Sequence, residues 1–166
     1  VQPPCRGQIV IPRRVVCAGV LDRPDMTVQV AHPEIRQQKR DDGRGGHEWL
    51  RYDREMGDAA FHVEWRFAPV EGADKYNSGV FVRTATDLSA WHQAQVGLGG
   101  GFLFGVTPVG GVVKRVTQEA AAARVRPAGE WNGYELVARG RTLSLWVNGA
   151  VTSEIAVGVP RGHFGL

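Results

Sequence analysis

The stretch FHVEWRF, residues 61–67, decides the fold class of this chain. Its apolar residues Phe61, Val63, Trp65 and Phe67 alternate one for one with polar residues. A period of two places successive side chains on opposite faces of a β-strand, and aromatic and β-branched residues favour strands. The stretch therefore predicts a strand with one buried face and one face turned to water.

Similar short patterns recur after this strand, separated by turn signals. Asn148-Gly149, between two apolar runs, is the strongest of them, because this dipeptide favours a tight hairpin turn. Glycine accounts for 22 of the 166 residues without a Gly-X-Y period, which fits turns rather than collagen. Regular turn signals predict an all-β sandwich or barrel. The further strands expected are Gly79–Thr84, Trp91–Val96, Val112–Val116, Tyr134–Arg139, Thr142–Val147 and Val151–Ala156.

Three segments depart from this pattern. Residues 33–46 have neither a helical nor a strand period and predict a loop. Residues 118–125 contain four alanines and predict a helix of one or two turns within a loop. Residues 1–22 hold both cysteines, Cys5 and Cys17, so a disulfide and two free thiols are both open. We expect residues 1–22 to form a leader or an edge segment, followed by a single domain over residues 23–166.

Composition excludes several classes of protein. Twenty Lys and Arg against 17 Asp and Glu give a net charge of +3, and the basic residues are spread rather than clustered, which argues against nucleic-acid binding. No run approaches the ~18 apolar residues that cross a bilayer, and the first residues have no apolar core of the signal-peptide kind. The motifs of serine hydrolases, zinc proteases, P-loop enzymes and EF-hands are absent.

Polar side chains on the expected strands form the candidate site. If the strands are neighbours, these side chains converge on one face, with Trp91 or Trp131 as an aromatic wall. Amides and guanidinium groups beside an aromatic ring suit the hydroxyl groups of sugars. The competing interpretation is an ordinary solvated sheet face, with both tryptophans in the core. The polar residues are Glu64, Arg66, Arg83, Gln93 and Gln95.

Several motifs between residues 47 and 166 occur together in one known family. In this order they resemble the DUF1080 family of 3-keto-disaccharide hydrolases, in the concanavalin A-like lectin/glucanase superfamily. The resemblance implies a jelly-roll sandwich of two antiparallel sheets that binds carbohydrate on a concave face. It also implies a bacterial protein of the periplasm or the exterior. The motifs are WLRYDREMGDAAFHVEWRF (49–67), NSGVFVR (77–83), HQAQVG (92–97), GGFLFG (100–105), EWNGYELVARGRTLSLWVNG (130–149) and a terminal GHFGL.

The resemblance assigns the family's motifs to residues of this chain. Its E-W-R is Glu64 and Arg66, and its W-N is Trp131 and Asn132. Two departures stand out: Gln93 occupies a position where the family often has Glu, and the chain stops at Leu166, where members usually continue into a last strand. Gln93 cannot act as a general base. The family's N-S-G-x-x-x-R corresponds to Asn77, Ser78, Gly79 and Arg83.

The resemblance also implies cleavage of glycosides whose sugar carries a ketone at C3. Such a ketone acidifies the C2 hydrogen, so one base and one positive group suffice for elimination at C1. We expect Glu64 to be the base and Arg66 or Arg83 to hold the enolate, with His62 and His92 as alternative bases. The expected sugar-binding residues are Asn77, Gln93, Gln95, Trp131 and His62.

Two other functions remain open. The first is a non-catalytic, lectin-like carbohydrate-binding module of the same fold, which the loss of Glu at Gln93 favours, since fold does not fix function. The second is a structural or interaction domain. An ordinary β-glucanase is disfavoured, because the chain lacks an E-x-D pattern of paired carboxylates. No cofactor is fixed by the sequence, and a divalent metal ion remains open.

Overall fold

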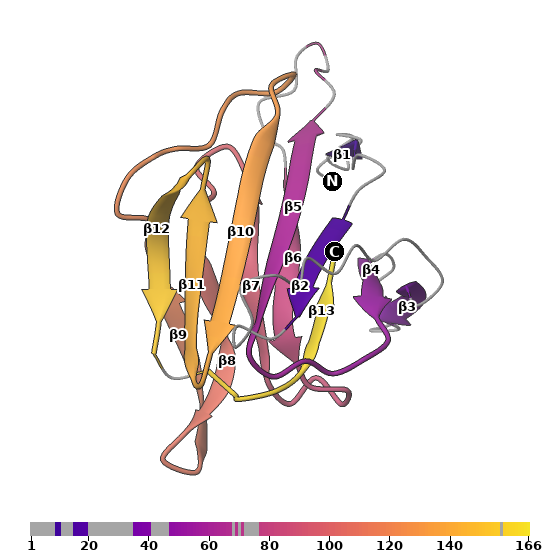
Figure 1. Cartoon of the computed structure of the whole chain (residues 1–166), viewed down its shortest axis with the longest axis vertical. Helices are drawn as coiled ribbons and strands as arrows, with labels where there is room; N and C mark the ends of the chain where they lie inside the picture. Colours follow the sequence, from indigo (N-terminus) through magenta and orange to yellow (C-terminus); the bar gives the residue numbers. More distant parts are fainter. Residues whose placement is uncertain are drawn as a thin grey trace, which may run out of the picture.

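The structure is a computed structural model in which all regular elements are β-strands. It describes residues 9–10, 15–19, 35–40, 47–67, 69, 71, 77–156 and 158–166, and only the backbone of those before residue 51. Thirteen strands within these ranges form two antiparallel sheets that face each other (Figure 1). The predicted all-β sandwich is therefore confirmed, with the two-layer arrangement of a jelly roll.

The first layer is a six-stranded sheet, drawn in front in Figure 1. Its order is β1-β5-β10-β11-β12, and β2 also pairs with β5. The alternating stretch of the sequence lies in β5, whose neighbour β10 continues into two hairpins. The strands are β1 (Ile9–Val10), β2 (Val15–Gly19), β5 (Ala59–Phe67), β10 (Asn132–Arg139), β11 (Thr142–Val147) and β12 (Ala150–Ile155).

The second layer is a seven-stranded sheet of order β3-β4-β13-β6-β7-β8-β9. The end of the chain returns to its middle, because β13 lies between β4 and β6. A four-strand meander, β6 to β9, fills the other half of this sheet. The strands are β3 (Ile35–Arg40), β4 (His47–Tyr52), β6 (Asn77–Thr84), β7 (Trp91–Gly97), β8 (Leu103–Val109), β9 (Val112–Gln118) and β13 (His163–Gly165).

The core lies between the two sheets and is built from alternate residues of each strand. Phe61 of β5 packs on Phe164 of β13, with ring centroids 5.1 Å apart. Tyr134 crosses the core, where its hydroxyl donates a hydrogen bond of 2.7 Å to the carbonyl oxygen of Gln95. Burial raises the pKa of Tyr134. Apolar burial of this kind is the main favourable term in folding, and the Tyr134 bond ties one layer to the other.

Two buried hydroxyls join the layers along the β12 edge. Thr152 donates to the carbonyl oxygen of Gly101 at 2.7 Å, and Ser153 donates to that of Gln118 at 2.8 Å. Ser153 also accepts from the backbone N–H of Leu103 at 3.1 Å. These bonds satisfy polar groups that would otherwise be buried without partners.

Two local predictions are wrong. Ile35–Arg40, expected within a loop, is strand β3 and pairs residue for residue with β4. The expected helix over 118–125 is absent: the Ala121 N–H donates to Thr152 O at 2.7 Å, and Arg124 O accepts from Asn148 at 2.7 Å. A short alanine run is a marginal helix, and tertiary hydrogen bonds outweigh its propensity. Residues 33–34 and 41–46 lie outside the described ranges.

Candidate functional site

The predicted site residues lie on opposite outer faces of the sandwich. Glu64 and Arg66 alternate with the buried residues of β5, on the outer face of the six-stranded sheet. Gln93 and Gln95 alternate with the buried residues of β7, on the outer face of the seven-stranded sheet. The prediction that these residues converge on one face is wrong, because β5 and β6 belong to different sheets although they are consecutive in the chain.

Arg83 belongs to neither face. It is fully buried, with a left-handed φ of 48°. Its guanidinium donates to the carbonyl oxygens of Gly57 (2.9 Å), Val159 (3.0 Å) and Gly140, and pairs with Asp58 at 3.1 Å. Burial lowers the pKa of Arg83, and Asp58 opposes that shift. Both terminal nitrogens are thus engaged by three loops of the protein itself, which gives Arg83 a structural place in the fold.

Three amides lie together on the seven-stranded sheet. Gln95 Nε2 donates to Asn77 Oδ1 at 2.6 Å, and Gln93 Nε2 donates to Gln95 Oε1 at 3.4 Å. Gly79 leaves room for this cluster, because a Cβ atom built there would lie 2.0 Å from Gln93 Nε2. The N-S-G motif of residues 77–79 therefore supplies the amide of Asn77 and, through Gly79, leaves space for the amide of Gln93.

Aromatic side chains adjoin the amides on the same face. Trp91 lies between Phe81 and Phe104, with ring centroids 6.2 and 5.6 Å away and edge-on geometry in both pairs. All three rings are half-buried. The guanidinium of Arg115 lies 5.9 Å from the Phe104 ring centroid. Trp91, one of the two predicted aromatic walls, therefore stands beside the predicted amides, and we call these rings and amides the amide–aromatic surface.

Arg51 is a site residue that the sequence analysis missed. The strand register aligns Arg51 with Gly165, Gly165 with Phe81, and Phe81 with Gln93, which puts them in one row across the sheet. Its Nε and Nη1 are buried without a hydrogen-bond partner, and Nη2 lies 3.8 Å from Asp53 Oδ1. In the sequence, Arg51 precedes Tyr52, which packs against the core, so Arg51 should point away from the core. Only the pairing of β4 with β13 shows that this outward direction leads to the face that carries Gln93.

Strands β6 to β9 contain no Asp or Glu. The amide–aromatic surface can therefore stack and hydrogen-bond a ligand, but these four strands give it no carboxylate base. His92, predicted as an alternative base, points into the core from β7 and is fully buried. Burial lowers the pKa of His92 to about 4, so its ring is neutral near pH 7.

The outer face of the six-stranded sheet brings together four of the predicted residues. His62 Nε2 lies 3.9 Å from Glu64 Oε1, and both side chains are about half exposed. The guanidinium of Arg66 lies 4.8 Å from the Trp131 ring centroid. This face combines a carboxylate, an imidazole and a cation, whereas strands β6 to β9 of the other sheet have no carboxylate. Asn132, the neighbour of Trp131 in the chain, is buried and instead holds the loop that precedes β10, accepting a hydrogen bond from the Arg126 N–H at 2.8 Å.

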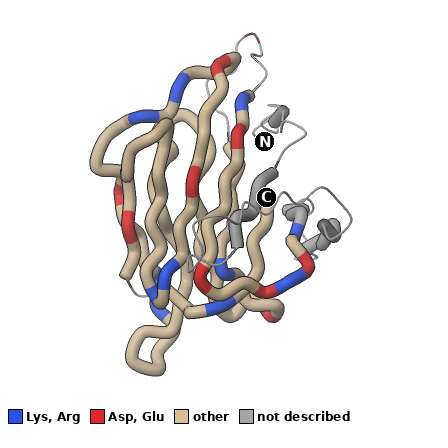
Figure 2. The backbone as a smooth tube through the Cα atoms, viewed as in Figure 1, with Lys and Arg blue, Asp and Glu red and all other residues tan. Residues whose placement is uncertain are grey.

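The charges of the described residues show no single dominant patch (Figure 2). Among these residues, no group of three or more His, Cys, Asp or Glu side chains is placed to hold a metal ion. In the same ranges, no helix is long and apolar enough to cross a membrane.

The fold has a solved counterpart. The chain is similar to the carbohydrate-binding module CBM66 from Bacillus subtilis, with a TM-score of 0.51 over 71% of each chain and 11% sequence identity. At this identity the likeness supports the fold alone. No curated protein matches the sequence.

The sequence itself matches a family over most of its length. The model of the 3-keto-alpha-glucoside-1,2-lyase-like domain covers residues 19–166, which begin at the last residue of β2 and include strands β3 to β13. This agrees with the motif order noted above and with the two-layer fold. The chain therefore belongs to the family of 3-keto-alpha-glucoside-1,2-lyase-like domains and has a carbohydrate-related function.

Proposed function

We propose that this domain binds carbohydrate on the amide–aromatic surface of the seven-stranded sheet, and does so without cleaving it there. The observation that carries the proposal is the juxtaposition of the Gln93 and Gln95 amides with the Trp91 ring, on strands that contain no carboxylate. The family, whose domain is described as 3-keto-alpha-glucoside-1,2-lyase-like, supports the same ligand class.

The chemistry of the surface suits sugar rings. Each amide offers donors and an acceptor, which matches hydroxyl groups that both donate and accept. An aromatic ring packs against the apolar C–H face of a sugar and excludes water. Arg51 lies at the other end of the row, with its Nε and Nη1 buried beneath the surface. Gln93 stands where the family often has Glu, and its amide can hydrogen-bond a sugar but cannot act as a general base.

Calorimetric titration with neutral oligosaccharides and with a 3-keto-disaccharide tests the proposal. Trp91→Ala and Gln93→Ala should each weaken binding by about tenfold, equivalent to about 1.4 kcal/mol. Val112→Ala is the matched control, since Val112 is exposed at the far end of the same sheet. Binding that survives both site variants unchanged would refute this location, and no binding by the unaltered protein would refute the function.

A second candidate is cleavage of 3-keto-glycosides on the other face. It is favoured by the close approach of His62 to Glu64 with Arg66 on the same strand. Glu64 would take the C2 proton, and the electron pair of that C–H bond would form an enolate whose C3 oxygen faces Arg66. Collapse of the enolate would break the C1–O bond, the departing oxygen would take a proton from His62, and water would add to the new double bond.

Turnover of 3-keto-trehalose or 3-keto-lactose tests this candidate. Glu64→Gln should lower the rate by about 10²–10⁴-fold, the usual contribution of a general base. Glu119→Gln, which changes an exposed carboxylate in the loop after β9, is the matched control and should keep its rate. Full activity of Glu64→Gln would exclude Glu64 as the base. If the unaltered protein shows no turnover, the cleavage candidate is excluded and only the binding function remains.

A further inference from the structure

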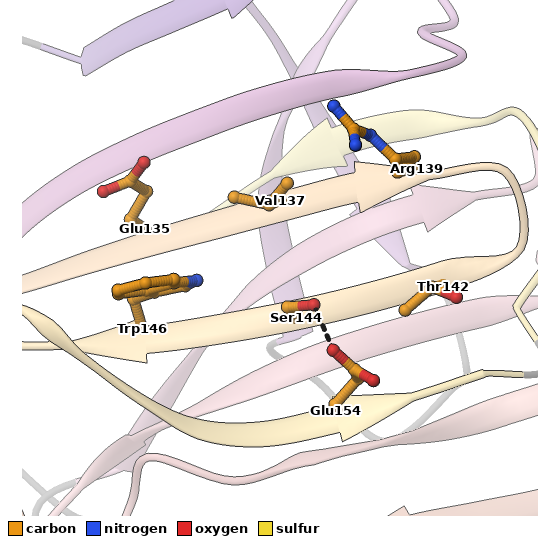
Figure 3. Close-up of a pocket in the computed structure, with 7 residues that line it drawn as sticks. All are labelled: Glu135, Val137, Arg139, Thr142, Ser144, Trp146 and Glu154. Carbon is orange, nitrogen blue, oxygen red and sulfur yellow. Dashed lines mark hydrogen bonds between the residues drawn. The ribbon is translucent and has the colours of Figure 1, made fainter. Parts of the chain in front are cut away.

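An open depression lies on the outer face of the six-stranded sheet, away from the amide–aromatic surface. It has a volume of about 510 Å³ and is formed by β10, β11 and β12. Figure 3 shows Glu135 and Trp146 at one end, Ser144 and Glu154 in the middle, and Arg139 and Thr142 at the other end. The lining residues are Glu135, Val137, Arg139, Thr142, Ser144, Trp146 and Glu154.

Trp146 is the most informative residue of this depression. It lies on β11, whose Leu143, Leu145 and Val147 are fully buried in the core, so its ring is on the outer face. It remains 38% exposed, although large aromatic rings are mostly buried in single domains. The strand register puts Glu135 directly opposite it. An exposed ring beside a carboxylate offers both a stacking wall and a hydrogen-bond acceptor.

Polar groups continue along the depression. Ser144 donates a hydrogen bond of 2.8 Å to Glu154 Oε2, which leaves the second oxygen of Glu154 open to other donors. Arg139 lies opposite Thr142 at the far end. From Thr142 to Trp146 the strand rises about 13 Å, which exceeds the length of one sugar ring. The depression therefore offers acceptors, a donor and an aromatic wall along an extended path.

We propose that this depression is a second carbohydrate site, which binds an extended neutral oligosaccharide along β11. The inference rests on the proposed carbohydrate function but places a separate ligand on the opposite side of the sandwich. Trp146 would stack on one ring, while Glu135 and Glu154 accept hydrogen bonds from hydroxyl groups. Two carboxylates against one guanidinium disfavour an anionic chain such as an oligouronate.

The depression leads toward the residues of the second candidate function. Glu135 lies opposite Trp146 on one side and opposite His62 on the other, so the Trp146 end of the depression is separated from His62 by one strand, β10. If cleavage occurs there, the depression holds the part of the substrate beyond the scissile bond. If it does not, the depression is a binding site alone.

NMR titration of the whole domain with a neutral hexasaccharide separates this site from the first one. Trp146→Ala should abolish the shifts of β10–β12 residues and weaken that binding event at least tenfold, while the shifts of β6–β8 persist. Trp91→Ala should give the reverse pattern. Loss of the β6–β8 shifts alone would leave this inference standing, whereas β10–β12 shifts that persist in Trp146→Ala, or never occur, would overturn it and leave the proposed function intact.

Glu135→Gln provides a second variant that preserves the shape of the depression. It should weaken neutral oligosaccharide binding several-fold, because a charged acceptor becomes a neutral one, and should improve binding of an oligogalacturonide, because one repulsive charge is gone. Glu119→Gln, a carboxylate outside the depression, is the charge-matched control. If oligogalacturonide binds the β10–β12 face as tightly as the neutral chain in the unaltered protein, the assigned ligand class is wrong.

Discussion

The two outer faces of this sandwich have the same architecture and different chemistry. On the seven-stranded sheet, β6 to β9 carry amides and aromatic rings without one carboxylate. On the six-stranded sheet, β5 and β10–β12 carry a histidine, carboxylates, arginines and an exposed tryptophan. The difference teaches that one fold carries two chemically distinct faces, and it is the basis for proposing binding on the first and proton transfer on the second.

Residues between the faces hold them in register without touching a ligand. Tyr134, Thr152 and Arg83 bind backbone carbonyls of the opposite layer or of neighbouring loops. A change at these positions should disturb both faces together, whereas a change on one face should leave the other intact. The predictions below use this contrast.

Arg83→Met should have the largest effect on stability. Removal of the guanidinium breaks its pair with the half-exposed Asp58 and leaves the carbonyl oxygens of Gly57 and Val159 without this donor, at a cost on the order of 3 kcal/mol in the free energy of unfolding. Urea denaturation measures this cost. Arg66→Met, on the outer face, is the control and should cost about 1 kcal/mol at most. A stable Arg83→Met variant that fails only in sugar binding would move Arg83 back into the site.

The pH dependence of stability should report His92, which faces the core. Its pKa is about 4 in the folded protein against 6.5 normally, so the unfolded chain binds the proton more readily between these values. Stability from this group is present above pH 6.5 and is lost as the pH falls toward 4, by an amount on the order of 3 kcal/mol. Denaturation at pH 7, 5.5 and 4 measures it.

His92→Leu is the comparison for that experiment. It removes the titrating ring, so the free energy of unfolding should fall less between pH 6.5 and pH 4 than in the unaltered protein. Burial is the main cause of the low pKa of His92; the backbone at Val82 opposes the shift, and the charge of Arg83 adds to it. A His92→Leu protein with an unchanged pH profile would assign the dependence to other groups.

Gly79→Ala should distinguish the faces with a single methyl group. A Cβ at position 79 would meet the Gln93 amide, so that side chain must move and sugar binding on the seven-stranded sheet should weaken several-fold. Gly133→Ala is the matched control, because its Cβ would lie at an ordinary 3.7 Å from His62 Cε1. Equal losses in both variants, measured by calorimetry, would contradict the placement of Gln93 in the site.

Ser144→Ala should have the smallest effect. The Ser144–Glu154 hydrogen bond is exposed, so its loss should change the free energy of unfolding by no more than about 0.5 kcal/mol. Binding in the β10–β12 depression should fall only a few-fold, since Trp146 remains. Thermal denaturation and titration on the same sample measure both quantities, and a large loss of stability would show that this pair supports the sheet itself.

The strands were predictable wherever alternation was strict. Phe61 to Phe67 gave β5, and Asn148-Gly149 gave the β11–β12 hairpin, as the structure confirms. β8 escaped prediction, because Gly105 and Pro108 interrupt its pattern. β3 was not predicted either, because Ile35–Arg40 is almost entirely polar and has no alternation. Its backbone pairing with β4 makes it a strand. The boundary at residue 22 and the catalytic roles stay predictions.

The candidate site was predictable in its residue types and not in its grouping. Gln93, Gln95 and Asn77 were identified from the sequence and do lie together. Glu64 and Arg66 were expected beside them and lie on the opposite side of the molecule. Alternation tells which side chains leave the core, but each sheet has its own outer face, and the sequence does not say which sheet a strand joins.

The sequence by itself determined the all-β class, the family and the chemistry available on each strand, because period, turn residues and motifs are local properties. Only the tertiary structure decided which strands share a sheet, that β13 returns between β4 and β6, and that Arg83 is buried among Gly57, Gly140 and Val159. The physical reason is that pairing between distant strands is selected by burial of the whole core, to which every strand contributes at once.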